Sequence, residues 1–191
     1  MFGLNLPNFL TLLRILLVPV LVAALLAADE SPGDLLAAAV FAVASFTDAI
    51  DGWLARRHES ITNFGKLMDP VADKLLIIAA LLSLVALDRV AAWVAMVIIA
   101  REFTVTVARL AARAEGVVIP ANWWGKVKTA VQVLTIFLLI LVDPAPLWLD
   151  GLVYAMVAVT VISGVDYFFG MRKLLREAEQ RRAHARESRA R

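Results

Sequence analysis

The chain has 191 residues, of which 61% are hydrophobic and 19% are charged, and its formal net charge is +2. A soluble domain of this length could not bury so much apolar surface, so we expect one integral membrane domain. The absence of cysteine excludes disulfides and thiol chemistry, and the presence of only two histidines argues against a histidine metal site or a Ser-His triad.

Six apolar runs follow one another along the chain, each about long enough to cross a ~30 Å hydrocarbon core. They cover residues 10–28, 35–54, 71–87, 90–110, 127–142 and 152–171. Backbone in lipid must satisfy its own hydrogen bonds, and no run alternates as a membrane strand would. The sequence therefore predicts an all-α polytopic membrane protein with six transmembrane helices. The amphipathic stretch 8–14 predicts a short N-terminal interfacial segment.

The basic residues predict an orientation. Three connections would lie on one side of the membrane, namely residues 29–34, 88–89 and 143–150. Arg89 is their only basic residue, and the other 18 of the 19 Lys and Arg lie on the opposite side or in helix regions nearer to it. By the positive-inside rule we expect a multi-pass cell (inner) membrane protein with both termini in the cytoplasm. We divide it into a six-helix transmembrane domain over residues 1–176 and a basic cytoplasmic tail over residues 177–191, for which the simplest interpretation is a helix resting on anionic lipid.

Four aspartates gather where the second run ends and the third begins: Asp48, Asp51, Asp69 and Asp73. On a helix that turns about 100° per residue, the first two share a narrow face with Gly52 and Ala55, and the last two, four apart, share a face of the next helix. In an antiparallel hairpin the four carboxylates can converge. Two such charges about 4 Å apart repel by roughly 4 kcal/mol at an effective dielectric near 20. Protonation or bound hard cations relieve this repulsion, and oxygen ligands favour Mg²⁺ or Mn²⁺.

Basic residues surround these acids: Arg56, Arg57, Lys66 and Lys74. Carboxylates for metals beside cations for phosphates are typical of metal-dependent phosphoryl transfer, and two metals give an economical charge balance. Each aspartate alone could simply be a charged helix end at the membrane interface. Spacings of three and four residues beside Gly52 and Gly65 argue against that interpretation for all four together.

The motif resembles a known family signature. It reads Asp48-x-x-Asp51-Gly52-x-x-Ala55-Arg56, then eight residues, then Gly65-x-x-x-Asp69-x-x-x-Asp73, and it matches the CDP-alcohol phosphatidyltransferases at every defined position. The resemblance implies that the four aspartates bind two divalent cations, that Asp73 activates the acceptor hydroxyl, and that Gly52, Arg56 and Thr62 hold the nucleotide end of CDP-diacylglycerol. We add Ala55 and Gly65 to that nucleotide site because they leave room for a bulky group to approach the backbone. The resemblance also suggests a homodimer.

Arg101 and Glu102 lie in the middle of the fourth run, where a charged residue costs ~2.5–3.5 kcal/mol on insertion scales. Arg101 and Arg109 are about 80° apart around a helix, so both can face an inner cavity. Adjacent helix residues diverge by about 100°, which argues against an Arg101–Glu102 pair and leaves pairing with another helix open. Lys126 and Lys128 complete a predicted second anion pocket, or else serve as snorkelling anchors at the interface.

The acceptor expected for this second pocket carries a phosphate. The surrounding strings are similar to the bacterial glycerol-3-phosphate branch of the family: Pro7-Asn8-x-x-Thr11-x-x-Arg14, Leu67-Met68-Asp69-Pro70-Val-Ala-Asp-Lys74, Ala100-Arg101-Glu102 and Gly125-Lys-Val-Lys-Thr129. We therefore expect transfer of the phosphatidyl group of CDP-diacylglycerol to glycerol 3-phosphate, whose phosphate would lie on Arg101, Arg109, Lys126 and Lys128. Asp166 in the sixth run either pairs with an arginine of the fourth or lies near the interface.

Several alternatives stay open. Within the family, inositol phosphate is the closest rival acceptor, followed by serine and by the lipid acceptor of cardiolipin synthesis, neither of which obviously needs four cationic side chains. From a different class, a small cation transporter would also use intramembrane acids. Such a transporter would spread polar groups through the bilayer midplane or contain repeated broken helices, whereas most acids here cluster at one mouth. We expect membrane lipids as partners and no nucleic acid.

Overall fold

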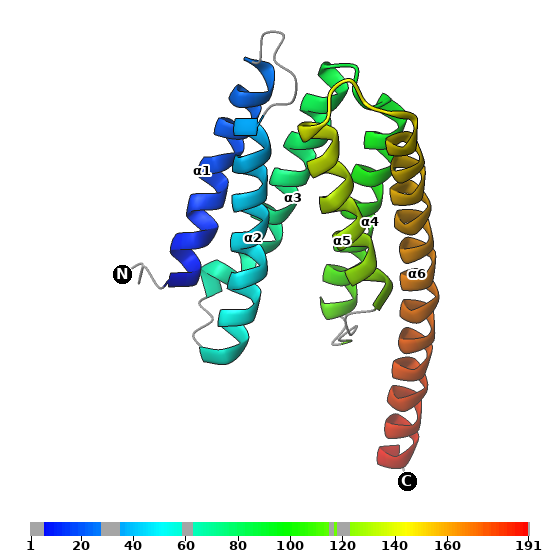
Figure 1. Cartoon of the computed structure of the whole chain (residues 1–191). Coiled ribbons are helices and arrows are strands. Elements are labelled where there is room, and N and C mark those ends of the chain that lie inside the picture. Colours follow the sequence, from blue (N-terminus) through cyan, green and yellow to red (C-terminus); the bar gives the residue numbers. More distant parts are fainter. Residues whose placement is uncertain (1–5, 28–34, 59–62, 115–116, 118–122, 191) are drawn as a thin grey trace. The chain divides into compact units, whose positions relative to one another are not determined.

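The computed structural model describes residues 6–27, 35–58, 63–114, 117 and 123–190. Side chains are described outside residues 6–10, 48–73, 114 and most of those beyond 172. The described residues form six α-helices and no strand (Figure 1): α1 (Leu6–Leu26), α2 (Leu35–His58), α3 (Asn63–Ala86), α4 (Ala92–Ala114), α5 (Trp123–Leu141) and α6 (Leu147–Ala190). The all-helical class is thus confirmed for this part of the chain.

The helices coincide with the apolar runs because Leu, Ala and Met favour helix. Pro19 is accommodated inside α1. Two described stretches are long and apolar enough to cross a membrane, Trp123–Leu141 and Leu147–Arg172. Shorter apolar helical stretches cover Thr11–Leu26, Leu35–Thr47 and Lys74–Ala86. The structure therefore contains two candidate spans within the described residues, and the six-span topology stays a prediction.

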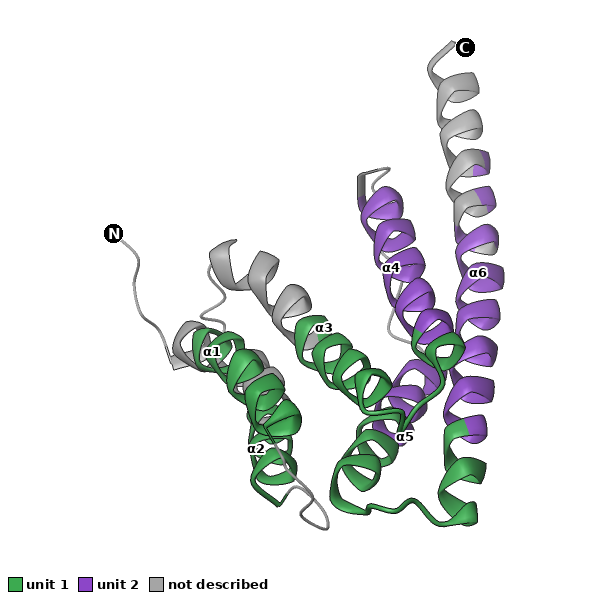
Figure 2. Ribbon diagram, turned by 90° about the horizontal axis from the view of Figure 1, so that it is seen from above, with its two compact units in different colours: residues 1–95, 132–153 green, residues 96–131, 154–191 purple. Residues whose placement is uncertain are grey.

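The chain divides into two compact units, which Figure 2 distinguishes by colour. Unit 1 comprises residues 1–95 and 132–153, and unit 2 comprises residues 96–131 and 154–191. In unit 1, α1, α2 and α3 alternate in direction along the chain (Figure 1), with α1 packed against both α2 and α3, and α2 packed against α3. Their buried apolar side chains include Leu21, Leu25, Phe41, Leu81 and Leu84.

Residues 8–14, predicted as an interfacial segment, belong to the uninterrupted helix α1. Arg14 is only 1% exposed and Thr11 only 4%. The polar side of this stretch is therefore buried within the protein, and its position relative to a membrane interface stays a prediction. A buried guanidinium requires polar or charged interactions, and Arg14 has such an interaction.

The turn after α3 is a Schellman motif. Asp88 has a positive φ of 56°, its N–H donates to the Val85 carbonyl at 3.1 Å, and the Arg89 N–H donates to the Leu84 carbonyl at 2.9 Å. The Arg89 guanidinium then donates to Asp143 Oδ2 at 2.6 Å. This ion pair, within unit 1, joins two of the connections that the sequence predicts on the same side.

Candidate functional site

The acid-rich motif occupies the end of α2 and the start of α3. Asp48, Asp51, Gly52, Ala55 and Arg56 lie on α2, and Gly65, Asp69 and Asp73 lie on α3. Because these consecutive helices are antiparallel and in contact (Figure 1), the end of α2 and the start of α3 lie at the same end of the hairpin. The side chains of these residues, and the whole of Thr62, lie outside the described residues. Their assignments to metal and nucleotide stay predictions.

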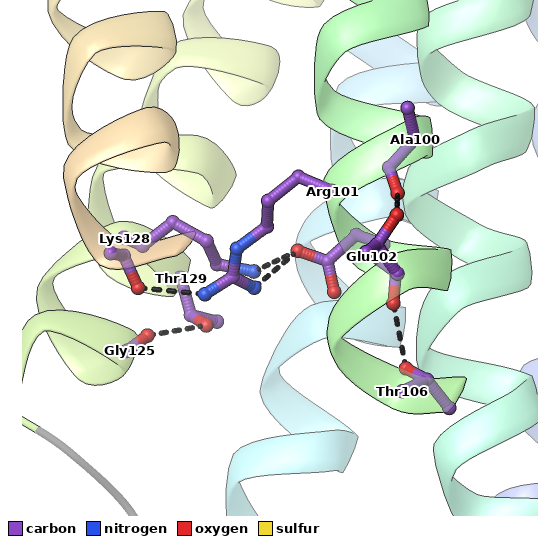
Figure 3. A network of polar contacts seen from close by, with 9 residues as sticks. Ala100, Arg101, Glu102, Thr106, Gly125, Lys128 and Thr129 are labelled. Carbon is purple, nitrogen blue, oxygen red and sulfur yellow. Dashed lines mark hydrogen bonds and ion pairs between the residues drawn. The ribbon is translucent and has the colours of Figure 1, made fainter. Parts of the chain in front are cut away.

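In unit 2, the Glu102 carboxylate accepts hydrogen bonds from two cationic side chains (Figure 3). Its Oε1 lies 3.0 Å from Arg101 Nη1 on the same helix, α4, and 2.5 Å from Lys128 Nζ on α5. The side chains of Arg101, Glu102 and Lys128 are 14%, 13% and 8% exposed. We call these three residues the charge triad. The two cations share one carboxylate at a site that is largely shielded from water. Hydrogen bonds between charged groups are stronger at such a site than at the exposed surface.

The contact between Arg101 and Glu102 contradicts the expectation that neighbouring helix positions diverge too far to pair. Their Cα–Cβ bonds do diverge by about 100°, but the long arginine stem lets the guanidinium turn back along the helix. The pairing with another helix that the sequence left open is also present, since Lys128 comes from α5. Both partners therefore converge on the same carboxylate oxygen.

Helix α6 fixes the other side of Arg101. Its Nη2 donates to Ser163 Oγ at 2.7 Å. A Cβ added at Gly164 would lie 3.4 Å from Arg101 Cγ, so the arginine stem passes over the glycine at van der Waals distance. The sequence pattern predicted no role for Ser163 or Gly164. The adjacent Ser163 and Gly164 in an apolar run could have indicated this contact, because small residues allow close approach between membrane helices.

The remaining residues of the predicted anion pocket are placed differently. Arg109 Cζ lies 5.6 Å from the centroid of the Tyr167 ring on α6, which is a cation–π contact. Lys126 is exposed, as expected for a position two residues, about 200°, from buried Lys128. Among the described residues no hydrogen bond or ion pair connects Lys126 to the charge triad. The structure thus brings Arg101 and Lys128 together and leaves the complete four-cation pocket as a prediction.

Asp166 does not pair with an arginine in the described part of the chain. Its Oδ2 is buried and has no hydrogen-bond partner there, and the same is true of Arg101 Nε. The hydroxyls of Thr106 and Thr129 bond back to the carbonyls of Glu102 and Gly125 on their own helices (Figure 3). Each of these hydroxyls therefore has an acceptor on its own helix.

The charge triad holds two cationic side chains, and Arg101 Nε is a buried donor without a hydrogen-bond partner among the described residues. A buried donor without a partner is costly, so an anion that accepted a hydrogen bond from it would lower the free energy of the site. Phosphate is suited to this because arginine binds it through two parallel hydrogen bonds. The site is therefore chemically competent to hold a phosphorylated ligand.

Comparisons with known proteins cover most of the chain. The family model of the CDP-alcohol phosphatidyltransferases matches residues 4–165. The CDP-diacylglycerol–glycerol-3-phosphate 3-phosphatidyltransferase of Bacillus subtilis (strain 168) is 43% identical over 180 residues, which are 86% of this chain and 93% of that protein. The probable phosphatidylglycerophosphate synthase of Mycobacterium tuberculosis (strain H37Rv) is 46% identical over 167 residues, 85% of this chain and 79% of that protein. A Rickettsia felis protein with the same name as the Bacillus one is 37% identical over 175 residues, 88% of this chain and 96% of its own length.

Proposed function

The chain belongs to the CDP-alcohol phosphatidyltransferase family, and on this premise we propose that it transfers the phosphatidyl group of CDP-diacylglycerol to glycerol 3-phosphate. The products are phosphatidylglycerophosphate and CMP. The single observation that favours a phosphorylated acceptor is the charge triad, in which Arg101 and Lys128 lie together at 14% and 8% exposure. Within it, Arg101 Nε is a buried donor without a hydrogen-bond partner in the described part of the chain. The names of the Bacillus and Mycobacterium relatives, which cover most of this chain, support the same acceptor.

At the hairpin of α2 and α3, we propose that Asp48, Asp51, Asp69 and Asp73 hold two divalent cations. Four carboxylates at one end of a hairpin form an all-oxygen donor set, which fits Mg²⁺ or Mn²⁺. When bound, these cations supply positive charge to the pyrophosphate of the donor and to the departing CMP. Gly52, Ala55, Arg56, Thr62 and Gly65 are the proposed contacts of the nucleotide end.

The reaction needs one proton transfer and one phosphoryl-centred substitution. Asp73 accepts the proton of the acceptor's primary hydroxyl. The resulting oxygen forms a bond to the phosphorus nearer the diacylglycerol, and the bond from that phosphorus to the oxygen of CMP breaks on the opposite side. No oxidant or further reactant is required, and the charge that leaves with CMP balances the charge brought by the attacking oxygen.

On the acceptor side, the phosphate of glycerol 3-phosphate is proposed to bind Arg101 and Lys128, with Arg109 and Lys126 completing the pocket. Arg101 provides a planar donor edge and Lys128 a point charge. A non-phosphorylated acceptor such as serine would offer no phosphate to these two cations. Inositol phosphate offers the same phosphate, and it is therefore the acceptor against which glycerol 3-phosphate must be compared.

We propose that the protein acts as a homodimer in the cell membrane, with six spans and with the active site and both termini in the cytoplasm. The apolar helical stretches along the chain support membrane insertion. The orientation is supported by the distribution of Lys and Arg, of which Arg89 alone lies in the three connections assigned to the outer side.

The test is CMP release by purified protein in mixed micelles of CDP-diacylglycerol, with Mg²⁺ or Mn²⁺ and a panel of acceptors. We expect release with glycerol 3-phosphate and little with inositol phosphate, serine or glycerol. Release with inositol phosphate alone would reject the acceptor assignment, and no release with any acceptor would reject the reaction. Asp48→Asn and Asp69→Asn should each abolish release at saturating Mg²⁺. Asp150→Asn, at an exposed position in the first turn of α6, is the matched control and should retain it.

A further inference from the structure

Helix α6 has polar residues with unsatisfied groups inside a stretch apolar enough to span a membrane. Within the described residues, Thr160 Oγ1, Asp166 Oδ2 and Tyr167 Oη are buried without a hydrogen-bond partner. Thr160 is 0% and Tyr167 6% exposed. Native proteins satisfy nearly all buried polar groups, and an ionisable residue at membrane depth is functional by default. These orphaned atoms therefore indicate a ligand that completes their hydrogen bonds.

Asp166 and Tyr167 are close in sequence to Ser163, the α6 residue that contacts the charge triad. Ser163, which accepts a hydrogen bond from Arg101, precedes Asp166 by three residues and Tyr167 by four, about one helical turn. Arg109 contacts the ring of Tyr167 from α4, so α4 meets α6 on both sides of Asp166. All of these residues belong to unit 2. A ligand held at Arg101 would extend along this part of the α4–α6 contact.

The chemistry of the orphaned atoms defines the group that would satisfy them. Asp166 Oδ2, in an ionised carboxylate, requires a donor, whereas Tyr167 Oη can donate as well as accept. A hydroxyl provides both functions at once. A metal cation is disfavoured beside Asp166, because Arg101 and Arg109 already place positive charge on this contact.

We propose that Asp166 and Tyr167 recognise the secondary hydroxyl of a polyol phosphate whose phosphate lies on Arg101. The hydroxyl donates to Asp166 Oδ2 and accepts from Tyr167 Oη. The two side chains are thus specificity-determining residues that select glycerol 3-phosphate over alcohol phosphates lacking that hydroxyl. This inference rests on the proposed function, since it assumes that the acceptor phosphate binds the charge triad.

The test compares kcat/KM for glycerol 3-phosphate and for 3-hydroxypropyl phosphate, which retains the primary hydroxyl and the phosphate but lacks the secondary hydroxyl. The wild-type protein should prefer glycerol 3-phosphate by about 100-fold or more, because a site built to bond a hydroxyl rejects the analogue without it. Asp166→Ala should reduce this preference at least tenfold by lowering the value for glycerol 3-phosphate alone. Asp166→Asn, which keeps an oxygen acceptor, should retain part of the preference for glycerol 3-phosphate. Tyr167→Phe should reduce that preference several-fold.

Two controls separate recognition from structure. Tyr154→Phe removes the hydroxyl of the other, exposed tyrosine of α6 and should leave the preference unchanged. The apparent unfolding temperature of Asp166→Ala should stay the same or rise, since the variant removes a buried carboxylate oxygen that has no hydrogen-bond partner within the described residues. Should Asp166→Ala not fold, Tyr167→Phe, which removes one oxygen atom, provides the same test.

The outcomes distinguish the two levels of the proposal. If the wild-type protein releases no CMP with glycerol 3-phosphate, the proposed function fails. If it uses glycerol 3-phosphate but the preference is unchanged in Asp166→Ala and Tyr167→Phe, only the hydroxyl site is refuted. An equal fall in kcat/KM for both acceptors in these variants would also refute the hydroxyl site, because that result would indicate a purely structural role.

Discussion

Replacement of Glu102 by glutamine is the sharpest perturbation of the charge triad. The change keeps the shape of the side chain and removes the negative charge that Arg101 and Lys128 share at 3.0 and 2.5 Å. Hydrogen bonds to charged groups contribute about 1.5–3 kcal/mol each. Removal of one partner from a buried ion pair costs about 3–5 kcal/mol. Since glutamine still offers one acceptor oxygen, we expect a loss of about 2–4 kcal/mol of unfolding free energy.

A double-mutant cycle with Lys128→Met isolates the contact from the side effects of each substitution. Each single variant removes one side of the Glu102–Lys128 contact. The double variant should therefore lose less unfolding free energy than the two single variants lose together. We expect a coupling of about 1–3 kcal/mol, as for other residues in direct contact. Unfolding in mixed micelles by SDS can be followed through helical circular dichroism and the fluorescence of the five tryptophans.

Lys126→Met provides the matched control for that cycle, because Lys126 is an exposed lysine on the same helix. Its coupling to Glu102→Gln should be below about 0.5 kcal/mol, as for residues without a shared partner. A coupling equally small for Lys128 would refute the triad as an energetic unit. The variant Glu102→Gln should also raise the KM for glycerol 3-phosphate, because Arg101 and Lys128 lose the carboxylate that positions them, while the KM for CDP-diacylglycerol stays unchanged.

Substitutions at three further positions test other parts of the structure. Gly164→Ala should be nearly neutral, because a Cβ at this position would lie 3.4 Å from the stem of Arg101. Gly164→Leu should displace that stem and raise the KM for glycerol 3-phosphate about tenfold or more in the CMP-release assay. Arg89→Met should lower the unfolding free energy by only about 0–1 kcal/mol without changing kinetics, because the side chain of its partner Asp143 is 41% exposed; a loss of activity would contradict its purely structural role. Asp88→Gly should raise stability by up to about 1 kcal/mol in the same SDS titration, since glycine adopts the φ of 56° without strain, and a destabilised variant would contradict that interpretation.

Local sequence determined much of this protein. Apolar runs bounded by turn residues specified six helices, and the turn at Asp88 follows from residues adjacent in the chain. The spacing of Asp48, Asp51, Asp69 and Asp73 carries the family signature, since motif residues on consecutive helices are related by local geometry alone. The sequence also located Arg101 and Glu102 as exceptional, because charges in apolar runs are costly wherever they lie.

The tertiary structure decided which partners those charges have. Pairing between Arg101 and Glu102 could not be deduced from helix periodicity, because long side chains turn toward whatever the neighbouring helices provide. Lys128 and Ser163 are 26 and 62 residues away from the residues they contact, so only packing of α5 and α6 on α4 brings them there. The same packing buries Tyr167 and the Oδ2 atom of Asp166. Whether these groups find hydrogen-bond partners depends on the neighbouring helices and not on local sequence. Local periodicity thus fixes where a charge lies on its helix, whereas its partners and its solvation depend on contacts between distant segments.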